Sequence, residues 1–229
     1  MRVSSREQQG AATAERAGEG EVPKARAART SAPGQNLNME VQIDADRLFS
    51  RLLALQSRWL ASKSGLWNGA DALAIPMGVT SDDELTYSKA AALHLYLLGY
   101  EFSDTLIVLA KGTCYFIATS KKCNLISAAI QQKPNAEMKI ELLVKSKEDN
   151  ANIDQFTMIL NAIKKQYGSK LGGLPKMECK GTFIPLWNST VAQSQLEVVD
   201  ISNALGVFFA TKDDSELVRD FSRTFKECI

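Results

Sequence analysis

The side chains that could carry out catalysis are few in this 229-residue sequence, and they lie far apart. The chain has a single histidine, His94, which lies between Leu93 and Leu97 in an apolar stretch. A serine or cysteine triad normally needs a histidine as its general base. Because the neighbours of His94 are apolar and at helical spacing, we interpret it as a core or surface histidine and expect no catalytic residue.

The residues that could bind a metal ion also lack a suitable spacing. The four cysteines form no C-x-x-C pair; they are Cys114, Cys123, Cys179 and Cys228. Isolated cysteines favour buried thiols in a reducing compartment over a disulfide framework or a zinc site. The acidic cluster Asp82-Asp83-Glu84 has neither EF-hand spacing nor a histidine companion. We therefore predict no metal ligand, and we interpret the cluster as a solvated loop or, alternatively, as a contact for a basic partner.

Composition and motifs exclude several further classes of function. Gly172-Gly173 belongs to neither a G-x-x-x-x-G-K-[ST] nor a G-x-G-x-x-G motif, so no nucleotide cofactor is expected. The net charge of +1 argues against a dedicated DNA-binding surface. No apolar run approaches the roughly 18 residues that a membrane span needs, and the N-terminus lacks the apolar region of a secretory signal. We expect a soluble intracellular protein.

The composition divides the chain into three parts. Residues 1–38 contain no aromatic residue and are rich in Ala, Gly, Arg, Glu and Ser, which predicts a disordered tail. Its scattered arginines could alternatively serve as a weak targeting arm, or Met39 could be the true start of the protein. Residues 39–211 form the predicted globular lobe. From residue 212 a last helix begins at Asp213 or Ser215 and runs to Ile229 without a capping residue, which indicates a fragment of a longer protein.

The centre of the lobe is the stretch from Leu97 to Lys122. A helix ends at Gly99, a residue that can take the left-handed conformation of a helix C-terminus. Two apolar runs follow, separated by Lys111-Gly112, which is typical of a β-hairpin. Neither run alternates between apolar and polar residues, so we expect both faces of the strands to be covered.

Helices and strands alternate along the rest of the lobe, which predicts an α/β fold with a mixed sheet covered by helices on both faces. Predicted helices occupy residues 44–65, 87–98, 121–132, 152–168 and 183–193, with Asp44, Ser120 and Asn152 as caps and Pro185 in a first turn. Predicted strands occupy residues 71–77, 138–144, 170–174, 196–201 and 207–211. Because Pro76 cannot donate to a ladder, the strand that contains it should lie at an edge or end early.

Several stretches of the lobe resemble the N-terminal domain of the large subunit of FACT-type histone chaperones, and more distantly the N-terminal lobe of the aminopeptidase P, creatinase and prolidase family. The resemblance covers about Val41 to Ile229. Its most specific segment runs from Ala92 to Thr105. The other matching pieces are Val41–Asp44, Arg58-Trp59, the apolar run to Ile117 with Thr119–Lys122, Gly181–Phe183, Trp187-Asn188, Val198–Ser202 and Lys212-Asp213.

This resemblance implies a nuclear, chromosome-associated and non-enzymatic lobe of a complex that reorganises nucleosomes in transcription, DNA replication and repair. The implied partners are histones and nucleosomes, through the full complex, and a small subunit in a heterodimer. The main contacts with these partners are expected in regions beyond this chain, and residues 212–229 would begin a truncated pita-bread lobe. The alternative is the N-terminal lobe of an Xaa-Pro metallopeptidase whose catalytic lobe is missing.

No partner-binding residue can be assigned from the sequence. The exposed candidates are the acidic loop around Asp82-Asp83-Glu84 and the elbow at Tyr100-Glu101, although we interpret Tyr100 as a packing residue. The polar residues Glu101, Asp104 and Thr105 have no evident partner in the sequence.

Overall fold

The structure, a computed structural model, describes residues 41–79, 88–133, 137–176 and 181–210. Its helices are α1 (Ala45–Ala61), α2 (Lys89–Leu98), α3 (Ser120–Gln132), α4 (Asp149–Gln166), α5 (Phe183–Gln193) and α6 (Ser202–Ala210). Its strands are β1 (Ala72–Met77), β2 (Thr105–Ala110), β3 (Thr113–Ala118), β4 (Lys139–Val144), β5 (Lys170–Gly173) and β6 (Glu197–Asp200).

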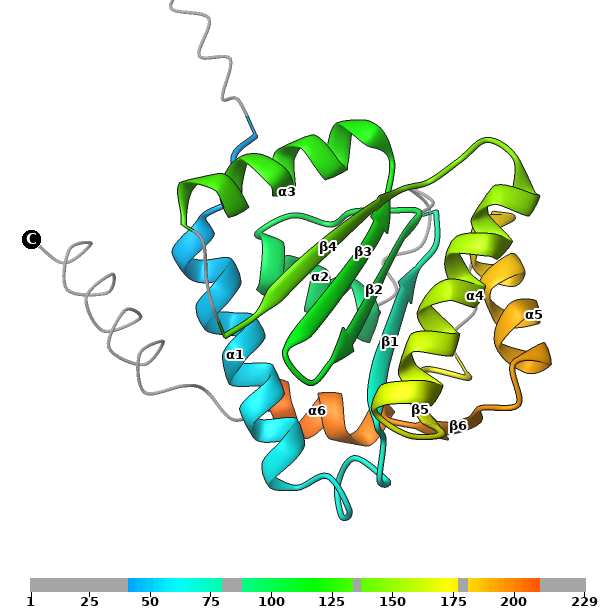
Figure 1. Cartoon of the computed structure of the whole chain (residues 1–229). Helices are drawn as coiled ribbons and strands as arrows, with labels where there is room; N and C mark the ends of the chain where they lie inside the picture. Colours follow the sequence, from blue (N-terminus) through cyan, green and yellow to red (C-terminus); the bar gives the residue numbers. More distant parts are fainter. Residues whose placement is uncertain (1–40, 80–87, 134–136, 177–180, 211–229) are drawn as a thin grey trace, which may run out of the picture. The chain divides into compact units, whose positions relative to one another are not determined.

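The six strands form one mixed sheet in the order β4-β3-β2-β1-β5-β6 (Figure 1). Strand β2 runs antiparallel to both β1 and β3, whereas the β3–β4, β1–β5 and β5–β6 pairs are parallel. Helices α1, α2, α3 and α6 contribute to the buried cluster on one face of the sheet, and α4 and α5 contribute to the cluster on the other. The predicted α/β fold with a sheet covered on both faces is confirmed.

The predicted hairpin at the centre of the lobe is confirmed. Gly99 ends α2 with φ of 77°, and its N–H donates to the carbonyl oxygen of Leu95 at 2.9 Å. Gly112 takes the same φ of 77° in the turn between β2 and β3. Every residue of β2 is buried, as is all of β3 except its first residue. Covered faces explain why neither strand alternates between apolar and polar residues.

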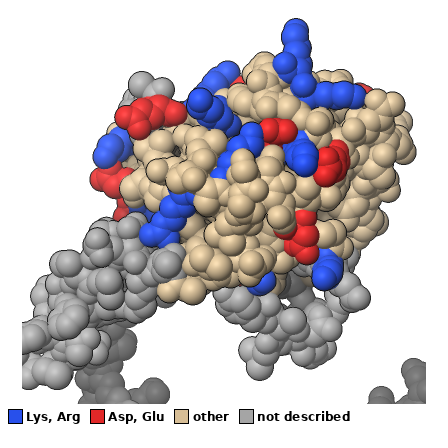
Figure 2. All heavy atoms as spheres, turned by 90° about the horizontal axis from the view of Figure 1, so that it is seen from below, with Lys and Arg blue, Asp and Glu red and all other residues tan. Residues whose placement is uncertain are grey.

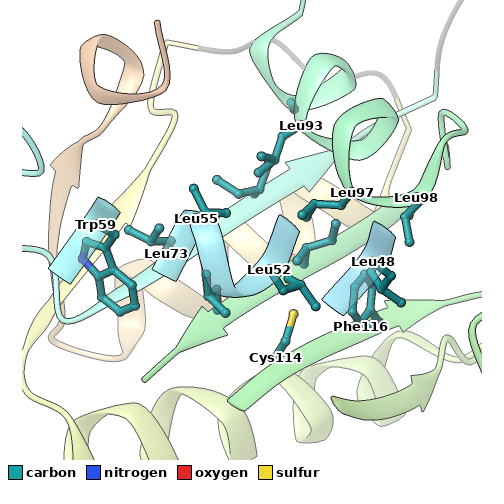
Figure 3. Close-up of a cluster of buried hydrophobic side chains, with 14 of the residues drawn as sticks. Leu48, Leu52, Leu55, Trp59, Leu73, Leu93, Leu97, Leu98, Cys114 and Phe116 are labelled. Carbon is teal, nitrogen blue, oxygen red and sulfur yellow. The ribbon is translucent and has the colours of Figure 1, made fainter. Parts of the chain in front are cut away.

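The larger of the two apolar clusters is built around α1 and α2. Figure 3 shows leucines of both helices directed at the sheet residues Leu73, Cys114 and Phe116. Trp59 is fully buried at the end of α1, and its indole N–H donates to the carbonyl oxygen of Ala70 at 3.0 Å. A buried tryptophan needs such a partner for its one donor. Helix α1 ends at Ala61 rather than near Gly65, because residues 62–69 form turns.

The prediction that Pro76 places its strand at an edge, or ends it early, is wrong. Strand β1 is central and runs through Met77, and Pro76 lies opposite Leu106 of β2. The parallel pairing with β5 involves only Ala72 and Leu73 of β1. Pro76 therefore lies beyond the short β5 ladder and has a strand partner on one side only, so its missing N–H does not interrupt that ladder.

The predicted strand over residues 207–211 is also wrong, because residues up to Ala210 belong to helix α6. Val, Phe and Phe at 207–209 favour a strand locally. The buried residues are Ala204, Leu205 and Phe208, however, which share one face at helical spacing. The side chain of Asp200 accepts a hydrogen bond from the Ser202 N–H at 2.8 Å, at the start of this helix.

Two predicted helix caps are shifted. Helix α3 begins at Ser120 with Thr119 as its N-cap, one residue earlier than expected. Helix α4 begins at Asp149 with Glu148 as its N-cap, so Asn152 does not cap it. The side chain of Asn152 is buried and instead binds the preceding loop. The other predicted elements lie where they were expected, including α5 with Pro185 in its first turn.

Several predictions fall outside the described residues. They concern the tail at 1–38, the acidic cluster Asp82-Asp83-Glu84, the last helix from residue 212, and the thiols Cys179 and Cys228. The domain boundaries at 39 and 212 accordingly stay predictions.

Candidate interaction surface

His94 lies in the core, as one of the two structural interpretations expected. Its side chain is fully buried, and neither imidazole nitrogen has a hydrogen-bond partner of ordinary geometry within the described part of the chain. Burial lowers the pKa of His94 to about 4; the Ile75 backbone opposes this change, and the nearby charge of Lys122 adds to it. A neutral imidazole enclosed in apolar surroundings is poorly placed to take a proton from a substrate.

The two described thiols are equally unsuited to nucleophilic chemistry. Cys114 and Cys123 are free and buried, as predicted. Burial raises the pKa of both thiols, so the reactive thiolate is disfavoured. Among the described residues there is also no group of three or more His, Cys, Asp or Glu side chains that could hold a metal ion.

Polar contacts concentrate instead at the elbow, which here means residues 99–104 between α2 and β2. Asp104 takes a φ of 53°, and its N–H donates to the carbonyl oxygen of Gly78 at 3.0 Å. Its carboxylate forms a partly buried ion pair with Lys145, which follows β4. The ammonium group of Lys145 also lies 4.7 Å from the ring centroid of Phe183 in α5. Asp104 thus has a convergent partner, which the sequence did not reveal because Lys145 is 41 residues away.

A second lysine holds the other side of the elbow. The ammonium group of Lys122, from the first turn of α3, donates to the carbonyl oxygen of Ser103 and lies 5.7 Å from the ring centroid of Phe102. The pKa of Lys122 is lowered, first by burial and also by the charge of Lys145, while Asp104 acts in the opposite direction. Two lysines from separate elements therefore fix the path of the elbow around one carboxylate.

The elbow itself faces solvent. Tyr100 is 38% exposed, so its interpretation as a packing residue is wrong. Glu101 is exposed as expected, and Leu95, one helical turn before Gly99, is 51% exposed. Protein interfaces are enriched in aromatic side chains, and Tyr100 is exposed near Leu95 of α2 in the sequence. We therefore take the elbow as the candidate interaction surface.

Charges of both signs are mixed on the surface of the lobe. On the face seen in Figure 2, lysine and arginine side chains alternate with aspartate and glutamate side chains over an uncharged background. Ion pairs contribute to this mixture: Lys63–Asp71, Lys139–Glu141 and Lys170–Glu197 have N···O distances of 2.5, 2.8 and 3.5 Å. Within the described part of the chain, no helix is long and apolar enough to cross a membrane.

Comparison with known proteins settles the family. The model of the "FACT complex subunit SPT16 N-terminal lobe domain" matches residues 43–204, most of the described lobe. The chain belongs to this family. The expected resemblance is thereby confirmed, and the elbow lies within the part of the chain that matches the SPT16 N-terminal lobe.

Individual SPT16 proteins and structures agree with this assignment. The chain is 35% identical over 196 residues to the FACT complex subunit SPT16 of Gibberella zeae and 31% identical over 183 residues to that of Arabidopsis thaliana. These alignments cover 83% and 77% of the chain but 18% and 17% of the relatives. The chain therefore spans about a fifth of the length of the curated relatives it matches.

Two solved SPT16 N-terminal domains share the fold. The domain from chickpea has a TM-score of 0.68 at 29% identity, with 77% of this chain and 41% of the solved chain covered. The domain from Eremothecium gossypii has a TM-score of 0.66 at 32% identity, with 76% and 40% covered. An X-Pro aminopeptidase from Thermotoga maritima is more distant, with a TM-score of 0.44 at 18% identity and 65% and 36% covered.

Proposed function

We propose that this chain is the non-catalytic N-terminal lobe of a FACT-type histone chaperone subunit. The observation that carries the proposal is the match of the SPT16 N-terminal lobe family over residues 43–204. The burial of the only histidine, with its lowered pKa, supports the absence of acid–base catalysis. The lobe would act as a protein-interaction module within a complex that reorganises nucleosomes during transcription, DNA replication and repair.

The proposed partners are histones and nucleosomes, reached through the full complex, and the small FACT subunit, bound in a heterodimer. The proposed location is the nucleus, on the chromosome. The mixture of charges on the described surface supports contact with proteins rather than with a DNA backbone, which would favour clustered lysine and arginine.

The experiment uses the full-length gene product that contains this lobe. Recombinant protein is mixed with the small subunit and with core histones, and each mixture is analysed by pull-down at two salt concentrations. We expect both partners to be retained. Failure to retain both the small subunit and the histones would remove the chaperone proposal.

A parallel assay addresses the peptidase alternative. The same protein is incubated with Xaa-Pro dipeptides, with and without added Mn²⁺, and product formation is followed by chromatography. We expect no hydrolysis above the blank. Hydrolysis, together with two Asp, one His and two Glu at metal-ligand positions in the downstream reading frame, would favour the peptidase. A long acidic C-terminal tail in that frame would favour the chaperone.

A further inference from the structure

The turn between α1 and β1 contains the only Asn-Gly pair in the sequence, Asn68-Gly69. Both residues have a positive φ, 53° for Asn68 and 76° for Gly69. The N–H of Ala70 donates to the carbonyl oxygen of Trp67 at 3.0 Å and closes the turn. These are the features of a type I′ turn, which favours Asn-Gly. Asn68 is exposed in this turn.

The side chain of Asn68 links the turn to a distant part of the chain. Its amide N–H donates to the carbonyl oxygen of Asp200 at 2.8 Å, across 132 residues of sequence. Asp200 is the last residue of β6, and its carboxylate accepts from the Ser202 N–H at the start of α6. In Figure 1 the turn lies at the bottom of the view, near α6 and β6. Asn68 thus holds the turn against the junction between β6 and α6.

An asparagine that precedes a glycine can lose its side-chain amide without an enzyme. The backbone nitrogen of Gly69 gives its proton to hydroxide and attacks Cγ of Asn68. The bond from Cγ to Nδ2 then breaks, Nδ2 takes up a proton and leaves as ammonia, and a five-membered succinimide remains. Water opens this ring at either carbonyl carbon, which gives aspartate or isoaspartate. The net reaction consumes one water molecule and releases one ammonia molecule.

Glycine at the second position is what favours this reaction. It has no Cβ, so the backbone reaches the geometry of the ring with little steric hindrance. Every other asparagine in the sequence precedes a residue that has a Cβ. The pair Asn68-Gly69 is therefore the most reactive of the chain by its local chemistry.

The folded lobe slows the reaction without preventing it. The Gly69 N–H donates to the carbonyl oxygen of Lys63 at 2.7 Å, and the Asn68 amide is engaged with Asp200. The reaction therefore starts from a turn that has opened locally. Exposed turns open at a much lower free energy than the whole domain, so this opening is frequent compared with global unfolding.

We propose that Asn68 is a site of spontaneous covalent modification, at which conversion to aspartate and isoaspartate breaks the link between the turn and the junction of β6 and α6. A carboxylate has no N–H to donate to the Asp200 carbonyl oxygen. Isoaspartate also adds a carbon atom to the main chain, which does not fit a type I′ turn. Because the ammonia is lost, the modified form accumulates with the age of the protein.

The first measurement follows the reaction in the wild-type 229-residue chain. The folded protein is incubated at pH 6 and pH 8 over several weeks and digested, and its peptides are analysed by mass spectrometry. Isoaspartate is detected by methyl transfer from S-adenosylmethionine with an isoaspartyl methyltransferase. A sample digested at the start corrects for conversion during digestion.

We expect the Asn68 peptide to convert to both products, and faster at pH 8, because the attacking nitrogen must lose its proton. Asn161 is exposed on α4 and precedes alanine, so it is an internal control that should convert far more slowly. Asn68→Gln should show no conversion, because glutamine would have to form a less favourable six-membered ring.

Asn68→Asp reproduces one product and tests its effect on the fold. Aspartate tolerates a positive φ, so the variant keeps the turn but loses the N–H donor. Its midpoint of thermal unfolding should fall by about 2–4 °C, as expected for one lost hydrogen bond in a domain of this size. Amide exchange at Ile201 and Ser202 should become faster.

Asn161→Asp is the matched control for charge. It makes the same substitution on α4, where Lys164 and Lys165 lie one helical turn further on, so it should not lower the midpoint. Conversion of Asn68 in the wild type that is no faster than conversion of Asn161 would overturn the proposal. So would an Asn68→Asp variant with the unfolding midpoint and the amide exchange of the wild type.

Discussion

Replacement of His94 by leucine tests the buried imidazole, and it should change how the stability of the lobe depends on pH. Burial lowers the pKa of His94 from an ordinary value of 6.5 to about 4. Between these two values the unfolded chain binds a proton at this residue while the folded chain does not. Unfolding therefore takes up a proton, and the free energy of unfolding falls as the pH falls through this range.

The size of the effect follows from the two pKa values. The difference of about 2.5 units corresponds to a loss of roughly 3 kcal/mol once the pH is below both values. Between pH 7 and pH 5 the loss from this residue is about 2 kcal/mol, because protonation of the folded form is still negligible there. Leucine has no titrating group, so His94→Leu should lack this part of the pH dependence.

Urea unfolding of both proteins at pH 7 and pH 5, followed by circular dichroism, measures the effect. At pH 7 the variant should be at least as stable as the wild type, because it removes a buried imidazole whose nitrogens lack hydrogen-bond partners of ordinary geometry. The free energy of unfolding of the variant minus that of the wild type should be about 2 kcal/mol larger at pH 5 than at pH 7. Equal pH dependence of the two proteins would show that His94 does not have a lowered pKa in the folded protein.

NMR gives an independent check. His94 is the only histidine, so the imidazole signals need no assignment by mutagenesis. Their titration midpoint in the folded protein should lie near 4, and a midpoint near 6.5 would show that the imidazole reaches water.

Three further substitutions test individual contacts that hold the elements together. Asn152→Ala should lower the free energy of unfolding by about 2 kcal/mol in urea titrations, because the buried amide accepts from the Ser146 N–H at 2.8 Å and donates to the Ser146 carbonyl oxygen at 3.0 Å. Asp104→Asn keeps a residue suited to the φ of 53° but removes the ion pair with Lys145, so it should cost about 1 kcal/mol in a double-mutant cycle with Lys145→Met. Gly172→Ala should cost about 1–3 kcal/mol in thermal melts, because a Cβ there would lie 2.8 Å from an Ile201 methyl group.

Each of these changes has a control. Gly173→Ala places its Cβ 3.5 Å from the nearest side-chain atom and should be tolerated, so equal losses at both glycines would contradict the packing argument. High salt should reduce the coupling between Asp104 and Lys145 only modestly, because the pair is partly buried, and a coupling energy near zero in the double-mutant cycle would argue against an ion pair. Asn152→Ala should also speed amide exchange at Ser146; unchanged exchange would show that the loop does not depend on the amide.

The local features of the fold could be predicted because nearby residues determine them. Gly99 ends a helix through its own backbone freedom, and the turn at Gly112 joins strands that are adjacent in the sequence. Pro185 fits the first turn of α5, where its missing N–H would have had no partner. Each of these signals lies within a few residues of its effect.

The wrong predictions concern features that depend on residues far away in the sequence. The central position of β1 depends on the late pairing with β5, about 100 residues further along the chain, and β5 ends before it reaches the level of Pro76. Helix α6 buries a face that includes Phe208, which packs edge-to-face on Tyr96 of α2, and such tertiary packing opposes the local strand preference of its sequence. The ion pair between Asp104 and Lys145 depends on tertiary structure in the same way.

We propose that this lobe belongs to a FACT-type histone chaperone subunit in the cell. Affinity purification of the tagged endogenous protein from nuclease-treated nuclei, followed by quantitative mass spectrometry, tests it most directly. The small FACT subunit and core histones should be enriched over an untagged control, with the small subunit near a one-to-one ratio. Absence of both from the purified material would contradict the claim.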